Sequence, residues 1–391
     1  MNFYRCPIAG STGYPFRCFL VDADFRGFVR ICLTSLTTAS DVHLSGERTI
    51  SRAGRADNRA MSKPLTGIRV LDLTRLLPGP ACTRMLADWG ATVTKIEPPE
   101  GDYANRLGLP ADAPAAQFSP LYTLVNRGKS IERLDLKSDA GRARLMGLVA
   151  DSDVLVEGFR PGVMDRFRLG FAALTKHNPA LVYSAITGYG SSSPWAHRAG
   201  HDINYLAMSG VLDQIGERGR PPSISNWQIA DLAGGALAAA ARICAALVAA
   251  KTTGVGSFVD VSMTHEVAGL NIIAEHALAL DALRPRGEDW LTGGWPCYAV
   301  YRTADERFLA VGALEEKFWH VLCDALDKPH LMALGSAEGI AAMRVKKELA
   351  DCFAAQDLAH WTEIFDALDC CVTPVLTLAE AKQHPLFKER S

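Results

Sequence analysis

The sequence predicts an α/β protein with a large domain built on a mostly parallel sheet, followed by a smaller α+β domain. Strand-like and helix-like segments alternate from residue 61 onward, and several strands are nearly continuous apolar runs such as VLVE. Runs of that kind are typical of parallel strands covered on both faces. The predicted division is a large domain over residues 61–263, a linker helix over 264–284 and a small domain over 285–391.

The strands of the large domain are predicted where apolar and β-branched residues run together. They cover residues 68–73, 91–97, 131–136, 153–157, 180–186 and 257–263. A helix is predicted from Pro78 to Trp89, because proline is favoured in a first helical turn. Further helices are predicted over residues 138–150, 234–250 and 264–283.

The small domain is predicted to begin with a β-hairpin, because two short apolar runs flank the turn TADER. The hairpin strands cover residues 298–303 and 308–311. Helical periodicity then continues to about Leu368, and a last short strand is predicted over residues 372–376.

Composition and motifs exclude several classes of function. The 41 Lys and Arg residues nearly balance the 43 Asp and Glu residues, unlike in proteins that bind nucleic acid or anionic membranes. Asp231 and Arg242 interrupt the most apolar stretch, so no transmembrane helix is predicted. The first strand-to-helix turn, LLPGP, lacks the glycine series of dinucleotide-binding loops, which disfavours an NAD-dependent enzyme.

The ten cysteines are spread over 391 residues and do not resemble a disulfide framework, so a cytoplasmic protein is expected. No metal or redox cofactor is indicated. Residues 1–60 contain eight Arg, no Lys and five acidic residues, without sustained periodicity. We expect a non-structural extension there, since acidic residues are unusual in a transit peptide; a targeting segment and a real structural element are the alternatives.

The loop GYGSSSPWAHRAGHDINY passes into a predicted helix at His201 and Asp202. Small residues let backbone amides approach a ligand closely, and an imidazole can exchange a proton near neutral pH. His201 is therefore a candidate acid or base. From position alone, the alternative is that His201 or Asp202 only caps the helix.

A single carboxylate, Asp231, interrupts the apolar sequence IADLAGGALAAAA. Burial in such a segment raises the pKa of a carboxyl group toward the range of a base, so Asp231 is a candidate base or nucleophile. The alternative is an N-cap followed by irregular backbone at Gly234 and Gly235. Glu315 and Glu316 begin another predicted helix, where acidic residues are explained by the helix dipole alone.

Taken in order, these segments resemble the class III CoA-transferase family (CaiB/BaiF), and within it the α-methylacyl-CoA racemases. The resembling segments lie within residues 64–388 and include PLTGIRVLDLTRLLPGP, NRGKSIERLDLKS, DVLVEGFRPGVMDRFRLG, GHDINYLAMSGVL and GGWPCYAVYRTADERFLAVGALEEKFW. The resemblance implies a large Rossmann-like domain, a smaller α+β domain and an interlocked homodimer with its sites between the subunits.

The resemblance also implies roles for three residues. The family has an Asp at the position of Asp231, which is the covalent nucleophile in the transferases. The racemases add a His at the position of His201 and a Glu at that of Glu315. This implies α-proton exchange on a 2-methylacyl-CoA through an enolate, with His201 and Asp231 as the acid and base. Glu315 would orient His201 across the subunit boundary, and amides at the helix start near Asp231 would serve the enolate oxygen.

CoA is the substrate's carrier, and the resemblance implies contacts with it in four places. These are Leu134, Asp135, Leu136 and Lys137; Gly158, Phe159 and Arg160; Arg166; and Gly200, Asp202, Ile203, Asn204 and Tyr205. Lys137 and Arg166 are the expected phosphate partners. Some racemases have an Arg where this chain has Pro98, so that adenine or phosphate contact is expected to be either absent or supplied by Lys95.

Two other functions remain open in the sequence. A true CoA-transferase would use Asp231 as a covalent nucleophile, and a noncatalytic protein would only bind acyl-CoA. The acyl chain is not indicated, because apolar sites discriminate weakly between chain lengths. Related chains continue beyond the small domain, so we expect either that the return segment is absent after Ser391 or that the sequence is a fragment. The last residues are not a peroxisomal SKL signal.

Overall fold

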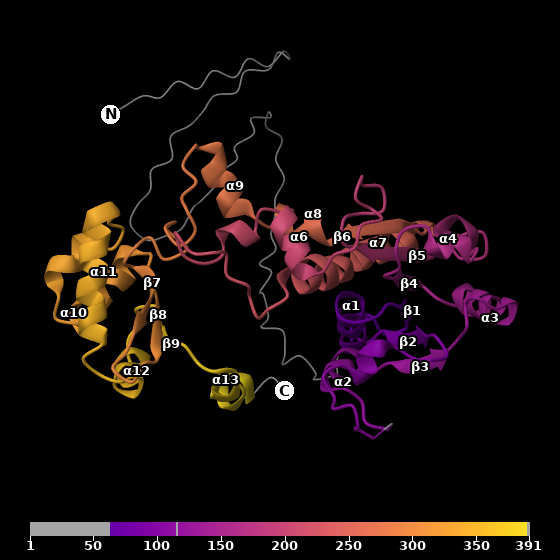
Figure 1. Cartoon of the computed structure of the whole chain (residues 1–391), viewed down its shortest axis with the longest axis horizontal. Helices are drawn as coiled ribbons and strands as arrows, with labels where there is room; N and C mark the ends of the chain where they lie inside the picture. The colour runs from indigo at the N-terminus through magenta and orange to yellow at the C-terminus, as the bar shows by residue number, and fades with distance from the viewer. Residues whose placement is uncertain (1–62, 115, 389–391) are drawn as a thin grey trace, which may run out of the picture. The chain divides into compact units, whose positions relative to one another are not determined.

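The computed structural model describes residues 63–114 and 116–388, so the prediction for residues 1–60 lies outside the described residues. Six parallel strands form the main sheet, in the order β3-β2-β1-β4-β5-β6 (Figure 1). They are β1 (Arg69–Leu73), β2 (Thr92–Glu97), β3 (Ser130–Arg133), β4 (Val154–Glu157), β5 (Val182–Thr187) and β6 (Phe258–Ser262). The predicted parallel sheet is confirmed. Its strand order reverses between β1 and β4, where open α/β sheets bind their ligands.

Helices cover both faces of this sheet, as the nearly continuous apolar strands require. On one face, α1 (Pro78–Asp88) and α7 (Ala238–Thr253) pack on a valine-rich layer that includes Val70, Val154 and Val182. On the other face, α3 (Asp139–Ala150), α4 (Val163–Arg166) and α5 (Phe171–Leu174) pack on Leu71, Leu155 and Tyr183. Each fully buried side chain of this kind stabilises the fold by about 1.5–3 kcal/mol.

Three predicted elements differ from those observed, and one of them is the helix predicted over 234–250, of which residues 234–237 belong to a π-helix. The third strand ends at Arg133 and not at residue 136, and the chain beyond it turns into α3, whose N-cap is Ser138. The helix predicted over 264–283 is broken into α8 (Met263–Gly269) and α9 (Ile272–Ala279). The break follows Gly269, and glycine is a poor helix former.

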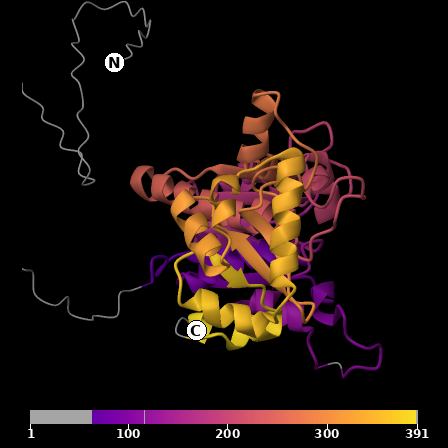
Figure 2. The ribbon, with the colours of Figure 1, turned by 90° about the vertical axis from the view of Figure 1, so that its left-hand side faces the viewer.

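The part of the chain predicted to be the small domain contains an antiparallel sheet of β7 (Tyr298–Arg302), β8 (Phe308–Gly312) and β9 (Val372–Pro374), which confirms the predicted hairpin and last strand. Its helices are seen best in Figure 2. They are α10 (Glu316–Ala325), η4 (Pro329–Leu334), α11 (Gly339–Phe353), α12 (Leu358–Asp366), α13 (Leu378–Gln383) and α14 (Pro385–Lys388). Phe353 is completely buried, and its ring lies 5.3 Å from that of Trp361, edge to face.

One continuous helical segment, Ala230–Thr253, is long and apolar enough to cross a membrane by length and composition alone. It contains Asp231 and Arg242, and its residues Ala239, Ile243 and Leu247 are buried in the core beside the sheet. A core helix passes the same test, so this segment is weak evidence for a membrane span.

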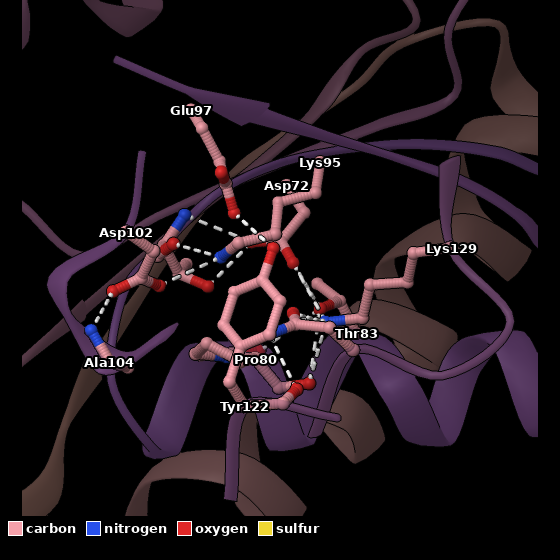
Figure 3. Close-up of polar contacts among 12 residues, drawn as sticks. Asp72, Pro80, Thr83, Lys95, Glu97, Asp102, Ala104, Tyr122 and Lys129 are labelled. Carbon is pink, nitrogen blue, oxygen red and sulfur yellow. Dashed lines mark hydrogen bonds and ion pairs between the residues drawn. The ribbon is translucent and has the colours of Figure 1, made fainter. Parts of the chain in front are cut away.

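A buried polar network lies beside the carboxyl ends of β1 and β2 (Figure 3). Asp72 of β1 is fully buried and forms an ion pair of 3.0 Å with Lys129, which follows α2 (Pro120–Asn126). Thr83 of α1 donates a further hydrogen bond of 2.6 Å to Asp72. Burial by itself would raise the pKa of Asp72, but Lys129, Lys95 and the hydroxyl groups of Thr74 and Thr83 hold it well below its ordinary value.

The second half of this network starts from Lys95 of β2. The Lys95 ammonium, also fully buried, lies 3.2 Å from the carboxylate of Asp102 and donates a hydrogen bond of 2.7 Å to the backbone oxygen of Thr74. Glu97, at the end of β2, accepts a hydrogen bond of 2.7 Å from Tyr122 of α2 (Figure 3). The network therefore ties together the segments that leave β1 and β2.

Candidate active site

His201 lies at the start of α6 (Asp202–Met208), as the sequence predicted. The side-chain oxygen of Asn204 accepts a hydrogen bond of 3.0 Å from the backbone N–H of His201, and the Tyr205 hydroxyl donates to the backbone oxygen of Gly200. These two bonds hold the turn before the helix. The His201 side chain is exposed, so a substrate can reach its imidazole.

Asp231 lies in the first turn of a π-helix, η3 (Ala230–Leu237), which continues directly into α7. The N-cap is Ile229, so the alternative reading of Asp231 as an N-cap is wrong. Gly234 and Gly235 do mark irregular backbone, and both are buried. An added Cβ on Gly234 would lie 2.8 Å from the backbone oxygen of Met263, so this wide turn packs tightly on α8. π-Helical turns are rare and are frequent at functional sites.

The structure brings the segments of His201 and Asp231 together. Asp202, the residue after His201, accepts a hydrogen bond of 2.9 Å through Oδ1 from the backbone N–H of Asp231. The backbone amide of Asp231 is thus already engaged, and the expectation that amides at this helix start serve an enolate oxygen stays a prediction for the neighbouring amides. Burial, and then the nearby Asp202 carboxylate, raise the pKa of Asp231 to about 7. At neutral pH this group is therefore divided between its acid and base forms.

Glu315 lies between β8 and α10, immediately before the helix, and its side chain is exposed. It makes no side-chain cap to the helix, so the structure offers no capping role for it. Within the described part of the chain, no hydrogen bond or ion pair joins Glu315 to His201. Its predicted role as a residue that orients His201 stays a prediction.

A crevice of about 220 Å³ lies at the carboxyl edge of the sheet, at the point where the strand order reverses. Four of the predicted CoA contacts, residues 134–137, line it after β3, and Phe159 lines it after β4. The backbone N–H of Lys137 donates to the Asp135 side chain, and Arg142 donates to the backbone oxygen of Lys137. The structure thus gathers predicted residues that are far apart in the sequence.

Other predicted CoA contacts lie around this crevice without lining it. Gly158 and Arg160 flank Phe159 in the turn after β4, and Arg166 ends α4; all three are exposed. The suggestion that Lys95 replaces the missing Arg near Pro98 is wrong. Its ammonium is completely buried and bound to Asp102 and Thr74, so it cannot reach a phosphate.

Sequence reasoning missed two features: Arg75, which lies in this crevice, and Glu157, which lines a neighbouring pocket and not the crevice. Arg75, just after β1, lines the crevice with its guanidinium 5.5 Å above the Phe159 ring, and no described residue forms an ion pair with it. Glu157, at the end of β4, is buried and accepts a hydrogen bond of 2.6 Å from the backbone N–H of Phe159. Burial raises the pKa of Glu157 to about 7. Arg75 directly follows a strand in a parallel-sheet pattern, which is a signal that could have found it.

Across residues 63–114 and 116–388, no three His, Cys, Asp or Glu side chains come close enough together to hold a metal ion.

Comparison with known proteins identifies related chains of similar length. The sequence profile described as CoA-transferase family III matches residues 65–391. A human alpha-methylacyl-CoA racemase is 40% identical over 333 residues, which are 83% of this chain and 81% of the human one. An acetyl-CoA:oxalate CoA-transferase from Acetobacter aceti is 33% identical, with 84% of this chain and 85% of the bacterial chain covered. The crystal structure of a CAIB/BAIF family protein from Brucella suis has a TM-score of 0.72 at 28% identity, covering 84% of this chain and 88% of that one.

Proposed function

Because the chain belongs to CoA-transferase family III, an enzyme family that acts on acyl-CoA, we propose that it racemises or epimerises 2-methylacyl-CoA thioesters. The observation that supports this most directly is the hydrogen bond between the Asp202 side chain and the backbone of Asp231, which joins the helix that begins after His201 to the helix that carries Asp231. Proton exchange at one carbon needs two ionisable groups, whereas covalent transfer of CoA needs one nucleophile.

The proposed reaction moves one proton off C2 of the acyl group and another onto it. One of His201 and Asp231 takes the proton, and the electron pair of the C–H bond passes to the thioester oxygen to form an enolate. The other group then protonates C2 from the opposite face, and the roles exchange in the reverse direction. A carboxyl group whose pKa is about 7 can serve in both roles near neutral pH.

The crevice at the carboxyl edge of the sheet is the proposed site of the CoA nucleotide. Its walls are apolar at Leu134, Leu136 and Phe159, which suits the faces of a purine. Its two cations, Arg75 and Lys137, are the proposed phosphate contacts, although the carboxylates of Glu97, Glu100 and Asp135 also line the crevice. The exposed Arg166 is proposed as a further phosphate contact at the rim.

The test follows the purified protein with (2S)-2-methylacyl-CoA in D2O, without an acceptor acid. NMR records the incorporation of deuterium at C2 and the inversion of configuration. We expect exchange in the wild type and a loss of at least 100-fold in His201→Ala, the size of a general acid–base contribution. No exchange by the wild type would refute the racemase proposal.

The second candidate function is CoA transfer, and the similarity to a transferase from Acetobacter aceti favours testing it. In this reaction Asp231 would attack the thioester carbonyl and form an anhydride with release of CoA. Adding a free carboxylic acid to the same assay distinguishes the two. CoA transfer without C2 exchange would make the chain a transferase. Binding of acyl-CoA with neither activity would make it a binding protein.

The homodimer and the role of Glu315 belong to the same proposal. If Glu315 of one subunit orients His201 of the other, each site needs residues from two chains. The homodimers of Glu315→Gln and of Asp231→Asn should then each be inactive. A heterodimer with one subunit of each variant should regain part of the activity, because one of its two sites has both native residues. Failure of mixed, exchanged subunits to regain activity would place Glu315 and Asp231 in the same chain's site or remove Glu315 from it.

A further inference from the structure

The hydrogen bond that joins the two candidate catalytic segments is made by the side chain of Asp202. This residue is half-buried, and its Oδ1 lies 2.9 Å from the backbone nitrogen of Asp231. The two residues are 29 positions apart in the sequence, so the bond is a tertiary contact between α6 and η3. In the part of the chain that the structure describes, no Lys, Arg or His forms an ion pair with Asp202.

The Asp202 carboxylate is important because its hydrogen-bond donor, the backbone N–H of Asp231, lies in the first turn of a helix. The backbone N–H groups in the first turn of a helix have no partner inside the helix. The free N–H of Asp231 is instead bound by the side chain of Asp202, and Asp202 directly follows His201 in the chain. The same side chain therefore fixes the start of the π-helix against the residue that carries the imidazole.

We propose that Asp202 is a positioning residue, whose carboxylate holds the backbone of Asp231 against the start of α6 and keeps Asp231 available as a proton donor. This inference rests on the proposed proton exchange, but it concerns a residue that touches neither C2 nor its proton. It assigns to the Asp202 side chain a role different from the CoA contact predicted from the sequence.

The electrostatics agree with this geometry. After burial, the carboxylate of Asp202 is the group that raises the pKa of Asp231. Tyr205, the other ionisable group on α6 beside Asp231, has a pKa raised to about 12 and stays neutral. The ionisable groups on the other elements packed against η3 are engaged elsewhere. They are His265, bonded to Ser262; Glu266, paired with Arg242; Arg84, paired with Asp88; Lys251, paired with Asp153; Asp260, bonded to Ser191; and the thiols of Cys82 and Cys244, whose pKa values are raised by burial.

Two substitutions separate the charge of Asp202 from its hydrogen bond. Asp202→Asn keeps an acceptor for the Asp231 amide and removes the charge, whereas Asp202→Ala removes both. Asp139→Asn is the matched control, because Asp139 is likewise the first residue of a helix, α3, but lies on the opposite face of the sheet. CoA affinity, measured by calorimetry, reports whether each variant still folds and binds.

The first readout needs no turnover. Infrared difference spectra between each protein and its Asp231→Asn counterpart report the protonated fraction of the Asp231 carboxyl as the pH is varied. In Asp202→Asn, we expect the midpoint to move to lower pH by roughly 0.5 to 1 pH unit, because a like charge is removed. Asp139→Asn should leave it unchanged. An unchanged midpoint in Asp202→Asn would overturn the electrostatic part of the proposal.

The second readout is the rate of C2 exchange. Asp202→Ala should lower kcat by roughly ten- to a hundredfold with little change in KM, the size expected for a lost hydrogen bond to a charged group. Asp202→Asn should retain most of kcat at its own pH optimum. Equal losses in both variants, or a loss confined to KM, would overturn the positioning role. Absence of exchange in the wild type would refute the proposed function but leave the infrared result decisive for Asp202.

Discussion

Asp72 and Lys95 are direct cross-strand partners on β1 and β2, yet neither forms its ion pair with the other. Asp72 forms an ion pair with Lys129, and Lys95 forms one with Asp102. Each of these two strand residues is therefore paired with a residue from outside the sheet. The consequence is that three separate segments, before α2, after α2 and at the end of β1, are anchored on two neighbouring strands (Figure 3). These anchors lie beside the crevice that we assign to the nucleotide.

Lys129→Met should destabilise the protein by about 3–5 kcal/mol, because it leaves the Asp72 carboxylate buried without its main cation. The double variant Asp72→Asn with Lys129→Met should recover part of this loss, since no unpaired charge remains. Lys347→Met is the control, because the Lys347–Asp351 pair is exposed and is worth about 0–1 kcal/mol. Urea unfolding measures all three. A loss below 1 kcal/mol in Lys129→Met would contradict the importance of the pair.

The stability of the fold should pass through a maximum in mildly acidic solution. The pKa of Asp72 lies below its ordinary value of 3.8, so its stabilising effect is present above that pH and is lost as the pH falls further. The pKa values of Asp231 and Glu157 are raised to about 7, so their protonation favours the folded state as the pH falls from 7 toward 4. Denaturant unfolding at several pH values checks this. In Asp231→Asn, the gain in stability between pH 7 and 4 should be smaller.

The rate of proton exchange should depend on pH with a midpoint near 7 from Asp231. In the direction in which Asp231 is the base, kcat/KM should rise up to that pH, and in the direction in which it is the acid, kcat/KM should fall above it. Separate assays with the (2R) and (2S) thioesters measure the two limbs. The same profile in both directions, flat between pH 6 and 8, would exclude Asp231 as the exchanging group.

Arg75→Ala should weaken CoA binding by roughly three- to tenfold, because a charge-assisted hydrogen bond to phosphate is lost at a partly exposed site. Comparison of CoA with dephospho-CoA by calorimetry identifies the phosphate concerned: a smaller loss for dephospho-CoA assigns Arg75 to the 3′-phosphate, and an equal loss assigns it to the pyrophosphate. Arg344→Ala, on an exposed position of α11, is the control. Unchanged affinity for both ligands in Arg75→Ala would remove Arg75 from the site.

Gly234→Ala should lower both stability, by about 1–3 kcal/mol, and activity, because the new methyl group would lie 2.8 Å from the backbone oxygen of Met263 and from Val267. Gly147→Ala on α3 is a matched control with open space around the new methyl group. It should stabilise the protein by about 0.5–1 kcal/mol, since alanine is the better helix former. Thermal unfolding and the C2 exchange assay measure both effects. Equal stability of the two variants would show that η3 can move away from α8.

The strands were predictable because burial on both faces leaves a continuous apolar run, as in β4, where all four residues are buried. The positions of His201 and Asp231 at helix starts were also predictable from the polar residues that interrupt apolar or glycine-rich sequence. The π-helix was not, because local sequence favours an α-helix there and the wider turn depends on packing of Gly234 and Gly235 against α8 and α1.

The roles of the lysines could not be predicted. Lysine is usually a surface residue. Only the tertiary fold reveals that the ammonium groups of Lys95 and Lys129 are buried and that each forms an ion pair with a buried carboxylate. The same holds for the bond from Asp202 to Asp231, which joins segments 29 positions apart. Local pattern fixes which face of an element is buried, but the pairing of distant polar groups depends on how the elements meet.

The pairing of β5 with β6 has a consequence for how the protein forms. Tyr183 of β5 pairs with Phe258 of β6, and the whole segment that carries His201 and Asp231 lies between them in the sequence. Contacts between residues far apart in sequence form late, because a long loop must close first. The ribosome must therefore synthesise the chain as far as Ser262, the end of β6, before His201 and Asp231 can reach their final positions. We expect nascent chains arrested before β6 to hold the first strands of the sheet but no assembled acid and base pair.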